Sequence, residues 1–268
     1  MVSAIGTRAF SDGVGTAKVA GCRSTGYAMR QMTDEDCPAK QRCRTAVFDH
    51  IMKYRERRWF RLLSLPSANW SFERMIHPTI EGNMPAFVAC ERDPSVFGAS
   101  AVMMPGMRRI SGQMELRHGT IDFLRSECAK IAMCDLSTLM GIGRGRHVSK
   151  WAKANFRDLW QNVTAVWLDF TCQLCREIED CVPRLSSWCD MKTPTVPVAL
   201  TFMGARETPD IGNKLYLLGE DRIGYAKRLL AYQRHRTFID DGHFEYVSSS
   251  GTPMVTVLGR LVSKENHA

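Results

Sequence analysis

The chain has 268 residues, with 36 Lys and Arg against 28 Asp and Glu, which gives a formal net charge of +8. This length fits one large domain or two small ones, and it allows a buried hydrophobic core. With 44% hydrophobic and 24% charged residues, the composition excludes a disordered or fibrous chain. No apolar run reaches the roughly 18 residues of a membrane-spanning helix, and residues 1–21 lack the apolar segment of a secretory signal. We therefore expect a soluble, cytoplasmic protein.

Ten cysteines are many for such a chain, but their spacing forms no dense disulfide framework. Cys90 and Cys134 lie in apolar runs, where thiols behave as small hydrophobic groups. Cys172 and Cys175 form a C-x-x-C motif, and a zinc site would need a second tight pair that Cys181 and Cys189 do not provide. We expect reduced thiols and no metal, with a metal site at this motif as the alternative.

The start of the chain predicts an arm followed by one domain. Residues 1–32 are rich in small residues without sustained periodicity, which indicates a flexible N-terminal arm. Residues 33–268 form the predicted domain. Its first helix is expected over 33–58, because Thr33 offers a cap and Val47 and Ile51 belong to an apolar stripe.

Short apolar runs then alternate with helical stretches. Further helices are expected to open at Asp122, to cover 128–140 and 173–187, and to begin at Thr208-Pro209 with an interruption at Gly219. The strands are expected at 61–65, 87–90, 114–118, 165–168, 196–203, 244–247 and 254–258. The alternation predicts an α/β fold: a seven-stranded, mostly parallel sheet with helices on both faces and a C-terminal antiparallel hairpin.

A basic insertion interrupts this alternation at about 125–163. Within it, residues 141–157 hold no acidic residue, and the cations are Arg144, Arg146, Lys150, Lys153 and Arg157. Such density suits contacts to the phosphates of nucleic acid, DNA or RNA; the alternative is a solvated helix whose aromatic residues face the core. The glycines at 141, 143 and 145 follow a predicted helix and not a strand, which favours a cationic loop over a phosphate-binding motif.

Three segments carry a resemblance to a known family: Leu62-Leu63-Ser64-Leu65-Pro66-Ser67, Phe87-Val88-Ala89-Cys90-Glu91-Arg92-Asp93 and Val166-Trp167-Leu168-Asp169-Phe170. With them, the chain over roughly 60–262 resembles the class I S-adenosylmethionine-dependent methyltransferases, whose Rossmann-like sheet ends in an antiparallel strand. Independently, open α/β sheets bind ligands outside the carboxyl ends of their strands.

The resemblance implies a role for several side chains. Glu91 would accept hydrogen bonds from the ribose hydroxyls of S-adenosylmethionine, and Asp122 would bind the adenine amine. Asp169 would be the catalytic residue beside the methyl acceptor. The alternative for each acid is an ordinary helix cap or a solvated carboxylate. The loop expected to hold the cofactor contributes Ser64, Pro66, Ser67 and Asn69.

The sequence departs from the family in ways that leave the substrate open. The loop over 64–69 contains no glycine, although a backbone that approaches the cofactor closely favours one. No Pro-Cys dipeptide is present, and the residues after Asp169 lack the proline pair of amino-group methyltransferases. We expect a methyltransferase-like protein that acts on nucleic acid. The alternative is a catalytically inactive protein that keeps the fold as a scaffold for nucleic acid or protein.

Overall fold

The computed structural model describes residues 37–55, 60–66, 71–76, 86–90, 108–116, 119–125, 129–132, 136, 140 and 162–264. The N-terminal arm expected over 1–32 and most of the basic insertion lie outside these residues. The helices are α2 (Pro38–Tyr54), α3 (Ser71–Ile76), α7 (Arg176–Cys181), the 3-10 helix η2 (Val182–Ser187), α8 (Pro209–Leu218) and α9 (Arg222–Ala231). The strands are β1 (Arg61–Ser64), β2 (Ala86–Cys90), β3 (Arg108–Leu116), β4 (Gly119–Arg125), β5 (Ala129–Ala132), β6 (Ala165–Leu174), β7 (Thr195–Glu207), β8 (Arg236–Val247) and β9 (Pro253–Ser263).

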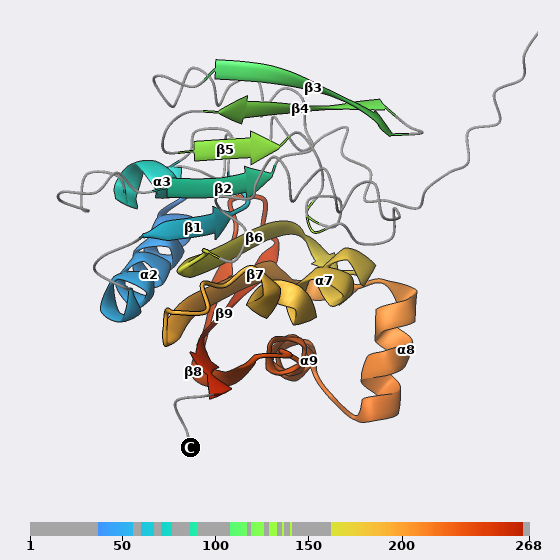
Figure 1. Ribbon diagram of the computed structural model, residues 1–268. Helices are drawn as coiled ribbons and strands as arrows, with labels where there is room; N and C mark the ends of the chain where they lie inside the picture. The colour runs from blue at the N-terminus through green and yellow to red at the C-terminus, as the bar shows by residue number, and fades with distance from the viewer. Residues whose placement is uncertain are drawn as a thin grey trace, which may run out of the picture.

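All of these strands belong to one sheet, in the order β3-β4-β5-β2-β1-β6-β7-β9-β8 (Figure 1). The central strands β5, β2, β1, β6 and β7 pair in parallel, while β9 lies antiparallel between β7 and β8. The predicted mixed sheet with a parallel centre and an antiparallel C-terminal hairpin is therefore confirmed. The predicted number of seven strands is wrong, because the described sheet has nine.

The additional strands arise where the sequence predicted helices. Asp122 lies inside β4 and pairs with Ser111 of β3, so the helix expected to open at Asp122 is not formed. The helix expected over 128–140 is replaced in part by β5, which pairs with β2 and β4. In both segments pairing with neighbouring strands outweighs a weak local helix signal, because strand formation depends strongly on tertiary context.

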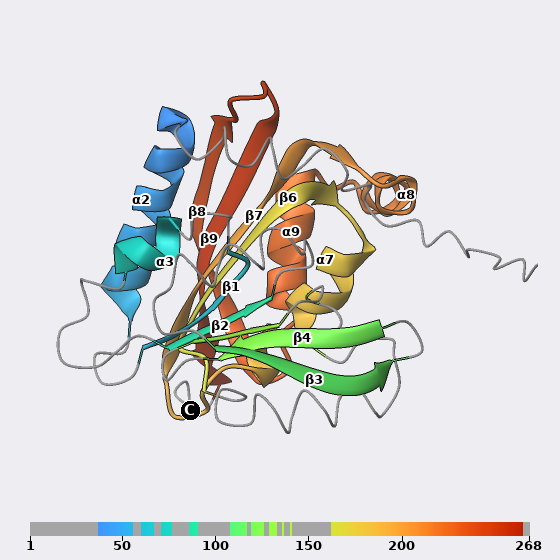
Figure 2. The ribbon, with the colours of Figure 1, turned by 90° about the horizontal axis from the view of Figure 1, so that it is seen from above.

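Helices cover both faces of the sheet. Figure 2 shows α2 and α3 on one face and α7 and α9 on the other. The side chains of β6 alternate accordingly: Trp167 packs with α2 and α3, whereas Val166, Leu168 and Phe170 pack on the α7 side. A central parallel strand buried on both faces requires apolar residues at nearly every position, which explains the unbroken apolar run that predicted this strand.

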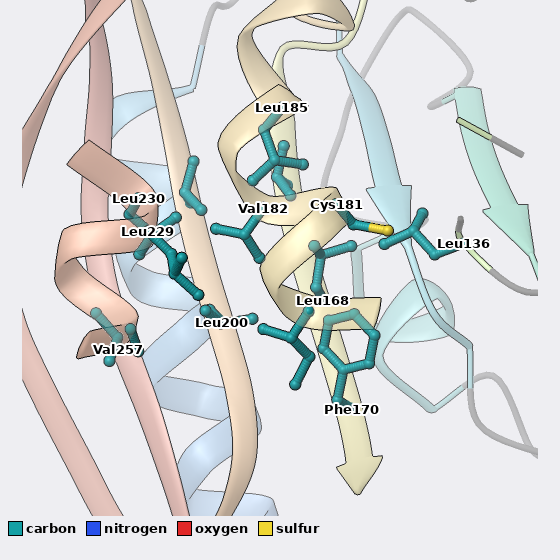
Figure 3. Packing of buried hydrophobic residues seen from close by; sticks show 14 of the residues in the cluster. Leu136, Leu168, Phe170, Cys181, Val182, Leu185, Leu200, Leu229, Leu230 and Val257 are labelled. Atoms are coloured by element: carbon teal, nitrogen blue, oxygen red, sulfur yellow. The ribbon is translucent and has the colours of Figure 1, made fainter. Parts of the chain in front are cut away.

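The larger core lies between the sheet and the helices α7, η2 and α9. Leu168 and Leu200 occupy paired positions on β6 and β7, and both are fully buried. Figure 3 shows Leu168 and Leu200 on the face of the sheet that Val182 of η2 and Leu230 of α9 cover. This packing fixes β6 relative to β7 at the centre of the sheet.

The helix signals of the C-terminal half were accurate. Thr208 is the N-cap residue of α8 with Pro209 at its first position, and Gly219 ends the helix with φ of 63°. A residue with positive φ commonly terminates a helix and favours glycine, which explains the interruption before α9. In the part of the chain that the structure describes, no helix has the length and hydropathy needed to cross a membrane.

Gly259 of β9 provides a test of the hairpin packing. A Cβ atom at this position would lie 2.6 Å from the carbonyl oxygen of Ile239 and would overlap the ring of Phe238. Because backbone must move to accommodate it, we expect Gly259→Ala to lower the free energy of unfolding by about 1–3 kcal/mol or more. Urea unfolding followed by circular dichroism measures this change.

The matched control is Gly212→Ala inside α8. Its added Cβ would meet the Glu207 side chain at an ordinary 3.5 Å. Alanine favours a helix over glycine, so this variant is expected to gain roughly 0.5–1 kcal/mol. Equal unfolding midpoints for the two variants would contradict the close approach of β8 to β9.

Candidate functional site

The carboxyl ends of the central parallel strands lie level with one another. Ser64, the last residue of β1, pairs with Ala89 of β2 on one side and with Trp167 of β6 on the other. We call this edge of the sheet the carboxyl rim, comprising Ser64, Cys90 and Asp169. From β1 the chain proceeds to β2, whereas β6 leads to β7 on the opposite side, so the strand order reverses between β1 and β6. Such a switch point is where open α/β sheets bind ligands.

Asp169 lies on β6 two residues beyond the partner of Ser64. Residues two apart on a strand face the same side of the sheet, so the Asp169 side chain lies with Trp167 on the α2 side. The strand does not end here, as the sequence had suggested, but continues to Leu174. The regular ladder stops at the pair Asp169 and Thr201 and resumes at Gln173 and Met203, so β6 holds two extra residues. Irregularities of this type redirect side chains near binding sites.

The carboxylate of Asp169 forms an ion pair with helix α2. Lys40 Nζ lies 2.6 Å from Asp169 Oδ2 and 3.2 Å from the hydroxyl oxygen of Tyr246 on β8. The side chains of Lys40 and Asp169 are only 9% and 11% exposed. At this burial the two charges compensate each other's loss of hydration, and removal of one partner would leave the other uncompensated.

One buried oxygen atom at the carboxyl rim, Asp169 Oδ1, has no hydrogen-bond partner among the described residues. The Ser64 hydroxyl, also buried, interacts with the carboxyl group of Glu73 on α3. Buried polar atoms are rarely left unsatisfied, so Asp169 Oδ1 is an oxygen that a donor from outside the described residues would satisfy.

Glu73 adds a second buried carboxyl group to the site. Burial raises the pKa of Glu73 to about 7, and the nearby charge of Asp169 acts in the same direction. The Ser64 hydroxyl and the charge of Arg44 on α2 oppose this rise. The site therefore brings together two cations and two acids from three elements, and one of the acids titrates near neutral pH.

Buried hydroxyl groups connect the sheet strands beneath this site to α2. The indole Nε1 of Trp167 donates to Thr201 Oγ1 at 3.1 Å, and Thr201 Oγ1 lies 2.9 Å from Thr256 Oγ1. The Cys43 thiol is 3.2 Å from the same Thr256 oxygen, and burial raises the pKa of Cys43 to about 11. Cys43 thus stays protonated and anchors α2 one turn after Lys40.

The structure brings together only part of the predicted site. Ser64 and Asp169 meet at the carboxyl rim, and Pro66 is buried directly after β1. Contrary to expectation, Asp122 does not follow a parallel strand but lies within the antiparallel pair β3 and β4, and β5 and β2 separate this pair from β1; its contact with adenine stays a prediction. The other predicted residues lie outside the described ones: Ser67, Asn69, Glu91, Arg144, Arg146, Lys150 and Lys153.

Four residues of the site were not found from the sequence: Lys40, Arg44, Glu73 and Tyr246. Lys40 and Arg44 are four residues apart on a helix, a spacing that normally indicates a solvated basic face. Glu73 offered one signal, because it lies inside the apolar segment Trp70-Ser71-Phe72-Glu73-Arg74-Met75-Ile76. Tyr246 reaches the site only because the C-terminal hairpin returns beside the central strands.

No protein-family model and no curated protein matches the sequence. Among solved structures, the chain is similar to the N-methyltransferase NodS from Bradyrhizobium japonicum WM9, at 8% identity and a TM-score of 0.44, over 85% of this chain and 98% of that one. It is similar to the 16S rRNA (adenine(1408)-N(1))-methyltransferase from Catenulisporales acidiphilia, at 9% identity and 0.39, over 84% and 93%. It is also similar to human methyltransferase-like protein 13 in complex with SAH, at 12% identity and 0.43, over 82% of each chain. No residue role and no activity is taken from these similarities.

The raised pKa of Glu73 predicts a specific dependence of stability on pH. Because the folded protein holds this proton up to about pH 7 while the usual value is 4.5, the stabilisation is complete below pH 4.5 and is lost as the pH rises through 7. We expect Glu73→Gln, which cannot ionise, to be more stable relative to the wild type at pH 8 than at pH 5, by up to roughly 3 kcal/mol. Urea unfolding at both pH values measures this difference.

The control for this measurement is Asp180→Asn on α7, where the carboxylate is 40% exposed and its ion-pair partner is Arg176. Its stability difference from the wild type is expected to change little between pH 5 and pH 8. A Glu73→Gln effect that is the same at both pH values would show that Glu73 is not buried as a protonated acid.

Proposed function

We propose that this protein is an S-adenosylmethionine-dependent methyltransferase that acts on nucleic acid. One observation carries the proposal: at the switch point between β1 and β6, the buried oxygen Asp169 Oδ1 lacks a partner among the described residues, and Ser64 lies at the end of the adjacent strand. A parallel sheet with hydroxyl and carboxylate oxygens at this position is suited to a nucleoside-containing ligand.

The residues of the carboxyl rim fit parts of S-adenosylmethionine. The Ser64 hydroxyl would hold a polar group of the cofactor directly above β1, and Pro66 fixes the backbone where the chain leaves the rim. Glu91 follows β2 in the sequence and would accept the ribose hydroxyls, in keeping with the family resemblance. When bound, the cofactor supplies a methyl group on a positively charged sulfur. A loop without glycine requires side chains to do more of the binding than the backbone.

Asp169 would orient the methyl acceptor, and its ion pair with Lys40 determines which carboxylate oxygen is available for this. Lys40 occupies Oδ2 and fixes the direction of the carboxylate, so that Oδ1 remains for another donor. Asp169 Oδ1 would orient an acceptor N–H or O–H group placed against it and would accept the proton of that group. Lys40 also donates to the Tyr246 hydroxyl, which holds Lys40 in place.

The choice of nucleic acid as the substrate class is supported by charge. The chain has a net charge of +8, and the sequence over 141–157 is basic without an acidic residue. Positive charge of this density favours polyanions, whose phosphates would be held while a base or ribose reaches the carboxyl rim. The alternative function is that of a catalytically inactive scaffold that keeps the fold and binds nucleic acid or protein.

Cofactor binding is the first test of the proposal. Isothermal titration calorimetry with S-adenosylhomocysteine is expected to give saturable binding to the wild type, and Glu91→Ala is expected to weaken it at least tenfold through loss of the ribose contacts.

Asp169→Asn is expected to retain binding and to lose transfer of a labelled methyl group to total RNA or DNA. Thermal unfolding of each variant checks that the fold is intact.

The control variant is Asp190→Ala. Asp190 lies at the opposite, amino end of β7, where its carboxylate accepts hydrogen bonds from Lys192 and Thr193. Because it is remote from the carboxyl rim, this change is expected to leave the affinity for S-adenosylhomocysteine unchanged. No heat from a folded wild type at millimolar ligand would refute the methyltransferase proposal and favour the scaffold.

Nucleic-acid binding is tested separately. The double variant Arg144→Ala/Arg146→Ala is expected to weaken binding of short DNA or RNA duplexes and single strands, and to reduce the dependence of log K on log salt by about one to two. Fluorescence anisotropy from 50 to 200 mM salt measures both quantities. The control is Arg176→Ala, an exposed cation at the start of α7, which removes one charge outside the basic segment. Unchanged affinity and slope in the double variant would exclude these arginines from the contact surface.

A further inference from the structure

Two cysteines at the end of β6 lie close enough to react with each other. Cys172 Sγ and Cys175 Sγ are 3.9 Å apart, and both side chains are half-buried. In a regular strand, residues three apart would point to opposite faces. Here the ladder is irregular on both sides of Gln173, and the strand ends at Leu174. The irregularity therefore turns the two thiols toward the same side.

The surroundings of Cys175 favour its thiolate form. The hydrogen bond with Cys172 and those from the backbone N–H groups of Ile178 and Glu177 lower the pKa of Cys175. Burial and the Glu177 carboxylate oppose this effect. The isolated buried Cys189 behaves differently, because burial raises its pKa to about 12. Because thiolate is the reactive form of cysteine, Cys175 is a better nucleophile toward disulfides than Cys189.

We propose that Cys172 and Cys175 form a redox-active dithiol site that closes reversibly to an intramolecular disulfide when it meets a low-molecular-weight disulfide such as oxidised glutathione. This site is separate from the Lys40–Asp169 pair and does not depend on the proposed methyltransferase activity. Among the residues that the structure describes, no group of three or more His, Cys, Asp and Glu side chains is arranged to hold a metal ion. The 3.9 Å distance between the two sulfur atoms is the observation that supports thiol–disulfide chemistry for this C-x-x-C pair.

The reaction balances with one equivalent of oxidant. The Cys175 thiolate attacks one sulfur of oxidised glutathione, forms a mixed disulfide and releases a glutathione thiolate. The Cys172 sulfur then attacks Cys175 Sγ, forms the protein disulfide and releases the second glutathione. The two protons of the protein thiols end on the two glutathiones, so the protein is oxidised by two electrons and the oxidant is reduced by two.

The closure requires only local movement. The two sulfur atoms must approach from 3.9 Å to about 2.05 Å, which a rotation about side-chain bonds can supply. Leu174 between them is buried in the larger core and holds the end of β6 in place. The fold beyond this turn is expected to remain intact in both redox states.

The test is a titration of the full chain against defined ratios of reduced to oxidised glutathione. The wild type is expected to lose two hydrogen atoms in its intact mass without gaining glutathione, and peptide mapping is expected to link Cys172 to Cys175. The reduced form should return with excess reduced glutathione. Cys172→Ser is expected to accumulate a mixed disulfide at Cys175, since the resolving thiol is missing, whereas Cys175→Ser is expected to react at least tenfold more slowly.

Cys37→Ser is the matched control, because Cys37 is also half-buried but its recorded contact is with the carbonyl oxygen of Val247. It is expected to leave the Cys172–Cys175 disulfide and its midpoint unchanged. Circular dichroism of each serine variant confirms folding, and a Cys172→Ala and Cys175→Ala pair repeats the test without added hydroxyl groups. A wild type that forms only glutathione adducts, or links other cysteines, would overturn the proposal.

Discussion

The ion pair between Lys40 and Asp169 is the interaction on which the candidate site depends. It joins the first described helix to the central strand β6 at the point where the strand order reverses. Both side chains are almost completely buried, so neither charge is stable there without the other. Through this contact, α2 determines which way the Asp169 carboxylate points, and the oxygen that Lys40 does not bind is directed to a second partner. The methyltransferase proposal relies on this orientation of the carboxylate.

The elements around this pair are rigid, which suits a site that must orient a ligand. Trp167 packs edge to face on Phe72 of α3, with ring centroids 4.0 Å apart, and its indole N–H is satisfied by Thr201. The chain of hydroxyl groups continues through Thr256 to Cys43 on α2. Sheet, α2 and α3 are therefore connected by specific polar contacts as well as apolar packing. Groups held in this way lose little freedom when a ligand binds.

The strand β6 holds residues of both proposed sites. Up to Asp169, β6 is a regular central strand, and its ladder with β7 becomes irregular beyond that residue. The irregular part presents Cys172 and Cys175 together, while the regular part holds Asp169 on the α2 side. The two sites face different surroundings, since the thiols pack against the larger core and Asp169 faces the smaller one. This separation explains why a change of redox state at the thiols needs no rearrangement of the ion pair.

The sequence by itself determined the parallel centre of the sheet, the C-terminal hairpin and the α8–α9 boundary, because apolar runs, Thr208-Pro209 and Gly219 are local signals. It also singled out Ser64, at the end of β1, and Asp169, which lies inside β6 and not at its end. Only the tertiary structure decided that Asp122 belongs to an extra hairpin and that 129–132 form a strand, because those pairings join segments with weak local preferences. The surroundings of Asp169 were equally hidden. Its partner Lys40 and Tyr246, which accepts a hydrogen bond from Lys40, lie 129 and 77 residues away in sequence, and no local pattern reports a contact made by chain packing.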